Sequence, residues 1–428
     1  MTTGRDGASV PVMSPIPPAS SPELDPPPVS APFVAAYTAA QIGAFIGFIP
    51  LLTLLLPLKA AAIDPAGKSE LLAIVALWGA VTAGASNVFA GAFSDRARLL
   101  GGGRWRWIAA GLAATILSYG LIAVASTREA LLLAVVAVQV SLNLMLNPLA
   151  AILPDEVPDH QKGMVSGFAG LAYPVSSLFS ALLIGIVLST EPARLWAVIG
   201  ATSLLVIPFT VVVKRRQRPF SLAPAGLAWS WAALKDHDFR LAFISRLAVQ
   251  TAVAMNVLYL LYFLQSETRI AAVMPGQRPE AVVGWILAAS TVTAIVAGLL
   301  AGLASDRIGR RRELIFAGGM CLATGSLLMA FTPGWPGPAV AQLVFGIGIG
   351  VYGVVDTALI AQILPDRANA GRDLGLMNIT TTAAQVLAPL LALVALELVG
   401  HDLRVLFALS GAIASFGAVT ILAIRRVR

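Results

Sequence analysis

The sequence predicts an all-α membrane protein with twelve transmembrane helices, arranged as two pseudo-symmetric bundles of six helices each. Hydrophobic residues make up 57% of the 428 positions and charged residues only 12%, far below the roughly 25% charged content of soluble domains. The chain contains twelve apolar runs of about the 20 residues needed to cross a bilayer. Two short motifs also recur at one common spacing, which indicates an internal duplication.

Residues 1–32 are predicted to be a disordered, proline-rich cytoplasmic tail. They hold nine of the 27 prolines, with Ser, Ala and Gly between them, and they lack the apolar core of a signal peptide. Prolines remove backbone donors and favour open polyproline conformations, so we expect no packing in this segment.

Twelve candidate spans follow the tail, six in each half of the chain. An N-terminal bundle over residues 33–213 contains spans at 33–58, 70–93, 105–126, 130–153, 163–189 and 194–213. A C-terminal bundle over residues 240–428 contains spans at 240–265, 281–303, 313–332, 338–363, 374–398 and 403–424. Residues 214–239 form a predicted cytoplasmic linker, in which Trp229, Trp231 and Leu234 suit a helix lying in the membrane interface.

The distribution of basic residues sets the predicted orientation, because Lys and Arg accumulate in cytoplasmic loops. If both termini are cytoplasmic, 21 of the 29 basic residues fall in inside segments, 7 in outside loops, and Arg246 lies within a helix. We therefore expect a multi-pass protein of the cell's inner (plasma) membrane with both termini in the cytoplasm. The net charge of +7 is an orientation signal. Since the arginines lie in short loops between spans, we expect no nucleic-acid partner.

The sequence offers little for metal or cofactor chemistry. Its one cysteine, Cys321, lies within a span, so neither a disulfide framework nor a thiolate metal cluster can form. His160, His237 and His401 fall in polar connections, and no two of them have the spacing of metal ligands. We expect no metal site and no cofactor.

One short motif matches a dinucleotide-binding pattern but does not predict a dinucleotide site. The stretch GIGVYG from Gly348 to Gly353 fits the pattern G-x-G-x-x-G letter for letter. That pattern binds a dinucleotide only between a strand and a helix of a βαβ unit. Here it lies inside an apolar span, where with Gly346 it predicts a small-residue face for close helix packing.

Two similar stretches, GAFSDRARLL and GLASDRIGRR, each end a span. Their aspartates, Asp95 and Asp306, are 211 positions apart, and the tetrapeptide ILPD recurs at Ile152 and Ile363 with the same offset. Two unrelated tetrapeptides would rarely share one offset by chance, so the chain is a duplicated six-helix unit. Because six is even, both copies enter the membrane in the same direction, which makes the halves parallel repeats.

The second stretch resembles the loop signature of the major facilitator superfamily of secondary transporters, G-x-L-a-D-R-x-G-R-R/K. GLASDRIGRRR departs from it at Ala304. The first stretch resembles the longer form of glycoside and sucrose-type sugar-cation symporters, S-D-R-T-x-S-R-x-G-R-R-R-P-W-I. Arg106 stands where proline is usual, and Gly103 where arginine is. The positions that match in register are Ser94, Asp95, Arg96, Gly102, Arg104, Trp107 and Ile108.

This resemblance implies a transporter that works by alternating access, with helices 1, 4, 7 and 10 around a central cavity. It also implies that helix 2 meets helix 11, and helix 5 meets helix 8, across the two halves. A cytoplasmic latch that breaks in the inward-open state follows from this geometry; the alternative is ordinary loop packing, with the arginines fixing orientation. The predicted latch residues are Asp95, Arg96, Asp306, Arg307, Lys162 and Arg372.

Polar side chains within the spans are candidates for substrate contact, because an unsatisfied polar group in hydrocarbon is costly. Several of them share a helix face at the spacing of one turn. Amides and aromatic rings can bind a sugar by hydrogen bonding and stacking, but amides also hold helices together, and both interpretations stay open. The predicted substrate-binding set is Gln41, Asn143, Asn147, Asn256, Tyr259, Asn378 and Gln385.

Asp356 on helix 10 is the candidate for proton coupling. It lies about 9 Å from the cytoplasmic end of its span, at roughly 1.5 Å per residue. A short carboxylate at that depth must be protonated, hydrated or paired. Arg246 on helix 7 lies at a similar depth, but its long side chain can reach the headgroups. Three interpretations compete: Asp356 carries the coupling proton, forms a static ion pair with Arg246, or contacts substrate.

Three classes of function compete for the chain as a whole. A membrane-embedded enzyme needs a catalytic constellation within the spans, and the sequence offers none, so we expect no enzyme. A non-transporting receptor or scaffold would not require the intramembrane charges. A solute transporter explains the duplication, the latch and the polar interior, and an ATP-driven pump is disfavoured because no G-x-x-x-x-G-K-[ST] loop occurs.

We therefore expect a monomeric secondary active transporter that moves a small solute across the lipid bilayer, coupled to a proton or another cation. Proton-coupled transport of a sugar or glycoside is the leading expectation, because of the asparagines predicted to face the cavity. Export of drugs or other amphiphilic compounds is the alternative, because many residues of the spans are aliphatic.

Overall fold

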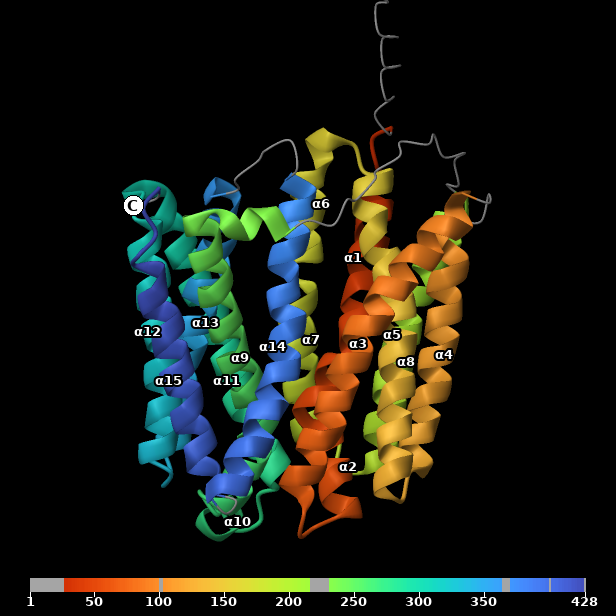
Figure 1. Cartoon of the computed structure of the whole chain (residues 1–428). Helices are drawn as coiled ribbons and strands as arrows, with labels where there is room; N and C mark the ends of the chain where they lie inside the picture. Colours follow the sequence, from red (N-terminus) through yellow and green to blue (C-terminus); the bar gives the residue numbers. More distant parts are fainter. Residues whose placement is uncertain (1–26, 100–102, 216–230, 364–369, 400–401, 427–428) are drawn as a thin grey trace, which may run out of the picture.

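A computed structural model describes residues 27–99, 103–215, 231–363, 370–399 and 402–426, and these residues form helices without a strand (Figure 1). The N-terminal half contains α1 (Ala31–Ile46), η1 (Leu51–Leu55), α2 (Leu56–Ile63), α3 (Lys68–Leu99), α4 (Arg104–Val124), α5 (Arg128–Glu156), α6 (Asp159–Ala169), α7 (Ala172–Phe179), η2 (Ser180–Val187) and α8 (Glu191–Arg215). The C-terminal half contains η3 (Trp231–Lys235), α9 (His237–Ser266), α10 (Ile270–Val273), α11 (Pro279–Ile308), α12 (Arg311–Phe331), α13 (Gly337–Ile363), α14 (Ala370–Val399) and α15 (Leu403–Ile421).

Twelve of the described helical segments are long and apolar enough to cross a membrane, which confirms the predicted fold class. The first span, Ala31–Ile63, joins α1, the π-helical segment η1 and α2. The fifth span, His160–Val187, joins α6, α7 and the π-helical segment η2. The chain is therefore a multi-pass membrane protein with six spans in each half.

The two halves lie side by side, and the two described ends of the chain lie at the same end of the bundle, one in each half (Figure 1). We call this end, where α1 begins and α15 ends, the terminal face. The other end, which carries α2 and α10, is the opposite face. Contacts between the halves run mainly from α14 to α3 and from α11 to η2. These are the helix pairs 2 and 11, and 5 and 8, that the resemblance implied.

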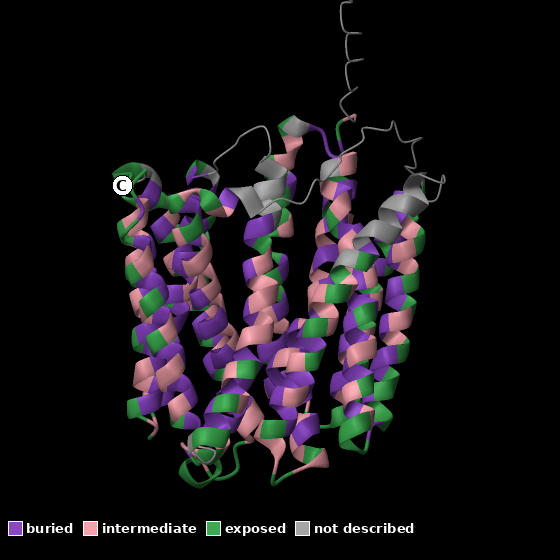
Figure 2. Cartoon of the chain, in the orientation of Figure 1, coloured by how far each residue is buried: buried purple, intermediate pink, exposed green. Residues whose placement is uncertain are grey.

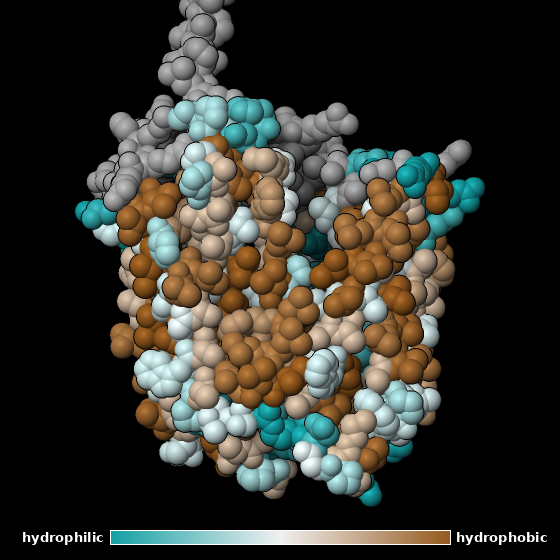
Figure 3. Space-filling view, turned by 180° about the vertical axis from the view of Figure 1, so that it is seen from behind, coloured by the Kyte–Doolittle hydropathy of each residue, from teal (hydrophilic) through white to brown (hydrophobic). Residues whose placement is uncertain are grey.

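Large apolar side chains are exposed on the outside of the bundle, as a protein surrounded by lipid requires. Leu117, Leu204 and Leu398 each expose more than seven-tenths of their surface. Buried residues lie mainly on helix faces turned to neighbouring helices (Figure 2). Seen from behind, an apolar band occupies the middle of the surface and hydrophilic residues gather towards both ends (Figure 3).

The glycines of the GIGVYG stretch serve helix packing, as predicted. A Cβ at Gly350 would collide with the carbonyl of Ala294 on α11, and one at Gly348 would lie 2.6 Å from the backbone nitrogen of Leu322 on α12. No strand precedes the motif within α13. The motif therefore brings three helices of the C-terminal half close together.

The two halves share a similar close approach between neighbouring helices. A Cβ at Gly111 of α4 would lie 2.5 Å from the backbone nitrogen of Met145 on α5, and one at Gly318 of α12 would lie 2.8 Å from that of Tyr352 on α13. The same number of residues separates the partners in both pairs. The third and fourth spans of each half thus pack through one shared glycine contact.

The described chain begins within the last residues of the predicted tail. Helix α1 begins at Ala31, and Pro32 occupies its first turn, where proline is well tolerated. Val29 is buried, and its backbone exchanges two hydrogen bonds with the Gln161 side chain, at 2.7 and 3.3 Å. These bonds fix the chain before the helix starts. Residues 1–26 lie outside the described structure.

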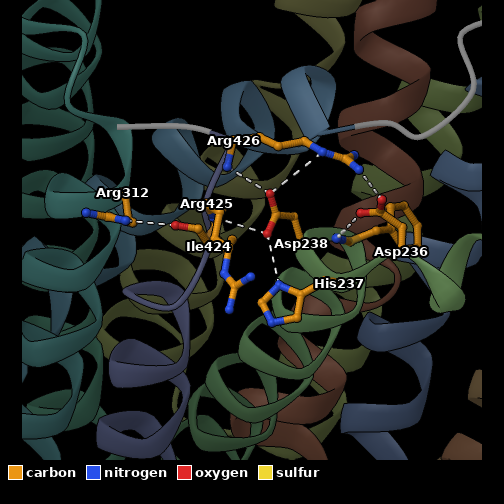
Figure 4. Close-up of polar contacts among 8 residues, drawn as sticks. Asp236, His237, Asp238, Arg312, Ile424, Arg425 and Arg426 are labelled. Atoms are coloured by element: carbon orange, nitrogen blue, oxygen red, sulfur yellow. Dashed lines mark hydrogen bonds and ion pairs between the residues drawn. The ribbon is translucent and has the colours of Figure 1, made fainter.

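At the terminal face, the C-terminal segment is bound to the start of α9 (Figure 4). The buried carboxylate of Asp238 accepts hydrogen bonds from the backbone N–H groups of Arg425, at 3.1 Å, and Arg426, at 2.8 Å. The Arg426 side chain pairs with Asp236, and Arg312 donates to the Ile424 carbonyl at 2.7 Å. The end of α15 is therefore fixed to the beginning of α9. Of the predicted linker, residues 214–215, which end α8, and residues 231–239 are described, and η3 is a 3₁₀ helix of five residues.

Candidate functional site

A cavity of about 430 Å³ lies between the two halves. Its N-terminal wall comes from η1 and the helices beside it, and its C-terminal wall comes from α9, α12, α13 and α14. Most of the lining is aliphatic. The polar side chains that line it are Thr53, Gln139, Tyr173, Arg246, Gln250, Tyr352, Asp356, Thr357, Thr381 and Gln385.

An ion pair stands on the C-terminal wall of this cavity. Nη1 of Arg246, on α9, donates to Oδ2 of Asp356, on α13, at 2.8 Å. The side chain of Asp356 is 6% exposed and that of Arg246 is 17% exposed. The structure thus brings together the two residues predicted for proton coupling, and both line the cavity.

The pair is bonded through only one of its two possible contacts. Nε of Arg246 and Oδ1 of Asp356 are both buried and have no hydrogen-bond partner among the described residues. The buried hydroxyl of Tyr352, one helical turn before Asp356, also makes no hydrogen bond of normal geometry with the described residues, although the Ser245 hydroxyl of α9 lies beside it. Guanidinium and carboxylate groups often bond through two parallel contacts. This end-on geometry therefore leaves a donor and an acceptor free to take new partners.

Two of the predicted substrate residues lie on α14, and they differ in position. Gln385 lines the cavity, one turn after Thr381, which lines it as well. Asn378 is exposed and is not among the residues that line this cavity. Within the predicted substrate-binding set, Gln385 is therefore the residue that lines this cavity.

The other predicted substrate residues make contacts within each half instead of lining this cavity. Gln41 donates to the Tyr37 hydroxyl at 2.7 Å, and the buried Asn256 accepts from Gln342 at 2.6 Å. Their amides thus bond to side chains of the same half. Tyr259 is fully buried, and its hydroxyl has no partner among the described residues.

The asparagine pair on α5 also makes contacts inside its half. Nδ2 of Asn143 donates to the Gln139 carbonyl at 2.9 Å, one turn earlier. Nδ2 of Asn147 donates to the Asn87 carbonyl on α3 at 3.2 Å, and to the Asn143 carbonyl at 3.1 Å. Two of these three bonds lie within α5, and the bond from Asn147 to Asn87 links α5 to α3.

Sequence reasoning missed several polar residues of the cavity. Gln139 and Gln250 are lining amides that the predicted set omits, and Tyr352 is a lining phenol. A signal for two of them was available in the spacing, because Gln250 follows Arg246 by four residues and Tyr352 precedes Asp356 by four. Residues four apart share a helix face.

A second ion pair joins the two halves near the opposite face. Arg194 of α8 donates through Nη2 to Glu280 of α11 at 3.0 Å, and through Nε to the carbonyls of Ile184 and Leu188 at 3.0 and 3.1 Å. These carbonyls belong to the last turn of η2, where helix geometry leaves such groups without partners. Both charged side chains are largely buried, at 5% and 14% exposed.

Further bonds between the halves surround this pair. Arg278 donates to the carbonyls of Ile186 and Leu188 at 2.5 and 2.9 Å. The Tyr262 hydroxyl donates to the Pro57 carbonyl at 2.7 Å, and Lys68 donates to Gln265 at 2.9 Å. All these residues lie in the half of the membrane next to the opposite face. We call these contacts, together with Arg194 and Glu280, the opposite-face seal.

The predicted latch is not placed by the structure. The side chains of Asp95, Arg96, Asp306 and Arg372 lie outside the described part of the chain. Arg307 is exposed at the end of α11, and Lys162 lies in α6. The latch therefore stays a prediction.

Comparison with known proteins places the chain among transporters. Residues 242–428 match the sequence model of the Major Facilitator Superfamily. No curated protein sequence matches the chain. Solved structures with a similar fold include the nucleoside transporter NupG, with a TM-score of 0.69 and 12% identity over 92% of this chain and 99% of that one. A peptide transporter, POT, in complex with sulfate has a TM-score of 0.70 and 13% identity over 92% and 93% of the two chains.

A third similar structure was solved in a named conformation. It is a bacterial homologue of the human lysosomal transporter Spinster in an inward-facing, occupied conformation, with a TM-score of 0.72. Its identity is 12%, over 94% of this chain and 98% of that one. At such low identity these likenesses show the fold alone. The family and the structures compared are transporters, not enzymes.

Proposed function

Because the chain belongs to the major facilitator superfamily, we propose that it is a proton-coupled secondary active transporter whose solute binds in the cavity between its two halves. The observation that carries this proposal is the Arg246–Asp356 pair on the cavity wall, with its free buried donor and acceptor. A charged pair inside a membrane is costly to keep and marks a functional site by default. The same cavity can therefore receive a solute and a proton.

The coupling step follows from the end-on geometry of the pair. Oδ1 of Asp356 has no described donor, so a proton can add there without first displacing Arg246 from Oδ2. Neutral Asp356 no longer compensates the guanidinium charge. Movement of the Arg246 side chain towards another acceptor or towards water then becomes favourable in free energy. A conformation with separate side chains is therefore favoured by protonation, which links proton binding to the change of state.

The seal supports an inward-facing assignment for this state. The bonds of the opposite-face seal close that end, while the cavity wall runs from mid-membrane residues such as Leu52 and Val257 to Asp356 and Thr357 near the terminal face. Basic residues predict that the terminal face is cytoplasmic. We accordingly place the protein in the cell's inner membrane as a monomer, with its cavity facing the cytoplasm.

The cavity favours an amphiphilic solute over a sugar. Aliphatic and alanine side chains form most of its wall, and the asparagines that favoured a sugar lie elsewhere. A sugar or glycoside is the second candidate, because Gln139, Gln250 and Gln385 line the cavity together with the rings of Phe48 and Tyr173. Amides can bond hydroxyl groups, and aromatic faces can stack on sugar rings.

A two-step experiment tests these proposals. Purified protein is screened for thermal stabilisation by sucrose, an alkyl glucoside, uridine, a dipeptide and tetraphenylphosphonium, since a ligand stabilises the state that binds it. A stabilising compound is then tested for accumulation in liposomes with an imposed pH gradient. We expect stabilisation by an amphiphilic compound and pH-driven accumulation. A hit that crosses only down its own gradient, at every imposed pH, would contradict proton coupling.

We keep the cytoplasmic latch as a proposal with its own test. Asp95→Asn and Asp306→Asn should each favour the inward-open state and slow transport, without reducing membrane insertion. The measurement is labelling of a cysteine introduced near the terminal face, in protein whose Cys321 has been replaced. Unchanged labelling in both variants would contradict the latch.

A further inference from the structure

We propose that the junction of α4 and α8 at the terminal face is a binding site for the headgroup of an anionic phospholipid. This site lies on the outside of the N-terminal half, apart from the cavity, and does not depend on the solute or on proton coupling. Three observations carry the inference: two cations beside one indole ring, the absence of acidic partners for them among the described residues, and two exposed apolar stripes that lead to them.

The indole ring of Trp105, in the first turn of α4, lies beside two cationic groups. Nζ of Lys214, at the end of α8, is 4.9 Å from the ring centroid, and the guanidinium carbon of Arg106 is 5.6 Å from it. Both cationic residues are exposed. Tryptophan and basic residues are the groups that membrane proteins place at the level of lipid headgroups.

The charges of Arg106 and Lys214 are not neutralised by a carboxylate within the part of the chain that the structure describes. Among the described residues, no carboxylate forms an ion pair with Arg106 or Lys214. The neighbouring Arg104 shows the contrast, because it is buried and bonds Asp155 of α5 at 2.6 Å. One arginine of the motif therefore packs the helices, while Arg106 and Lys214 keep their charge available for an anion from outside.

Each cation stands at the end of an exposed stripe on its helix. On α8 the exposed residues Leu204, Ile207 and Val211 lead to Lys214 in steps of three and four. On α4 the exposed face runs from Leu117 through positions 113 and 110 to Arg106 in the same steps. Steps of three and four keep residues on one side of a helix, so both stripes face the lipid.

The stripes distinguish a lipid from free phosphate as the ligand. Acyl chains can lie along the two apolar stripes, while the phosphate of the headgroup reaches the cations at the terminal face. Basic sites between transmembrane helices are a known mode of recognising anionic headgroups. A zwitterionic headgroup carries its own cation, so we expect it to bind less tightly to the two positive charges of this site.

The test is lipid binding to delipidated protein in neutral detergent, measured by native mass spectrometry. Phosphatidylglycerol and phosphatidylcholine of equal chain length are titrated in parallel, with inorganic phosphate as competitor. We expect the Arg106→Gln/Lys214→Gln variant to bind phosphatidylglycerol about tenfold more weakly than the unmodified protein, with phosphatidylcholine binding unchanged. The matched control is Lys235→Gln/Arg240→Gln, which removes two exposed cations of the same face and should bind like the unmodified protein.

Several outcomes would overturn the proposal. Equal losses in the test and control variants would mean that only the general positive field attracts the lipid. Equal affinity of the unmodified protein for the two lipids would exclude a preference for anionic headgroups. Displacement of phosphatidylglycerol by millimolar phosphate would assign the site to a free anion. As a further check, Trp105→Leu keeps both charges and should weaken binding only about threefold, because exposed cation–π contacts are weak.

Discussion

Among the described residues, two arginine–carboxylate pairs have both partners within candidate membrane spans, and the two pairs are bonded in different ways. In the opposite-face seal, Arg194 uses Nη2 for Glu280 and Nε for two backbone carbonyls. In the cavity, Arg246 bonds Asp356 through Nη1. Nε of Arg246 and Oδ1 of Asp356 have no described partner. The first pair joins the two halves, whereas the second lies within the C-terminal half.

The difference shows how burial alone fails to define the role of an ion pair. A buried charge is stable where hydrogen bonds satisfy its remaining groups, and each unsatisfied group costs about 1–3 kcal/mol. Arg194 and Glu280 therefore act as a closed contact that holds this state. Arg246 and Asp356 each keep a hydrogen-bonding group without a described partner in this state. A proton, a solute or water can therefore change their arrangement at little cost in free energy.

The largest expected effect is the loss of uphill transport in Asp356→Asn. The amide keeps the size of the side chain but cannot carry a proton. With a solute found by the stabilisation screen, we expect pH-driven accumulation in liposomes to fall to background, while exchange without a gradient continues.

A surface control separates coupling from general damage. Glu313→Gln removes a carboxylate paired with Arg310 outside the membrane core, and this variant should accumulate solute normally. Uphill uptake retained in Asp356→Asn would remove Asp356 as the coupling site. Loss of exchange as well would favour the static ion pair or the substrate contact.

The sequence was sufficient for the cavity pair but not for the seal. Asp356 stood out because a carboxylate within an apolar run has few stable options, and Arg246 was the only basic residue more than two positions inside a predicted span. Arg194 and Arg278 were predicted only as charges of outside loops. Their partners are largely backbone carbonyls at the end of a π-helical segment. No pattern of side chains in the sequence predicts which carbonyls are available as partners.

The spans and their duplication were predictable because membrane thickness fixes the length of an apolar run. The amides that line the cavity were harder to predict, since an amide on a helix can face a cavity or a neighbouring helix. Asn256 and Asn147 bond Gln342 and the Asn87 carbonyl, and those partners come from other helices. Their choice depends on the rotation of each helix, which tertiary packing decides.

A second expected effect concerns the seal. Glu280→Gln leaves the charge of Arg194 uncompensated, and hydrogen bonds to charged groups contribute about 1.5–3 kcal/mol. The outward-open population should therefore rise about tenfold or more, since 1.4 kcal/mol corresponds to a factor of ten. The measurement is labelling by a membrane-impermeant maleimide of a cysteine at position 257, on the cavity wall, in protein without Cys321.

The control for the seal breaks an ion pair on the same face but within one half. Glu191 pairs with Lys59 at 2.6 Å, and both residues belong to the N-terminal half. Glu191→Gln should leave labelling at position 257 unchanged. Equal labelling of the Glu280 and Glu191 variants would mean that Arg194 and Glu280 do not hold the opposite face closed.

Asp238 extends the comparison to a carboxylate with several partners at the terminal face. Asp238→Asn removes the charge that holds two backbone N–H groups of the C-terminal segment, so we expect a loss of about 2 kcal/mol and faster tryptic release of that segment. Asp402→Asn is the control, because Asp402 caps the exposed start of α15. Its loss should be smaller, about 1 kcal/mol or less. Equal melting temperatures for the two variants would contradict the role of Asp238.

The smallest expected effect is that of Tyr352→Phe, which tests whether the groups around the cavity pair are unsatisfied. The buried Tyr352 hydroxyl makes no hydrogen bond of normal geometry with the described residues, so its removal should leave the melting temperature unchanged or raise it, by the equivalent of up to about 1 kcal/mol. Tyr119→Phe is the matched control, because the Tyr119 hydroxyl is equally buried but donates to the Gly47 carbonyl at 2.6 Å. That variant should lose about 1 kcal/mol. If both variants were destabilised alike, the Tyr352 hydroxyl would have a partner in this state, and the contrast between a satisfied seal and an unsatisfied cavity pair would no longer hold.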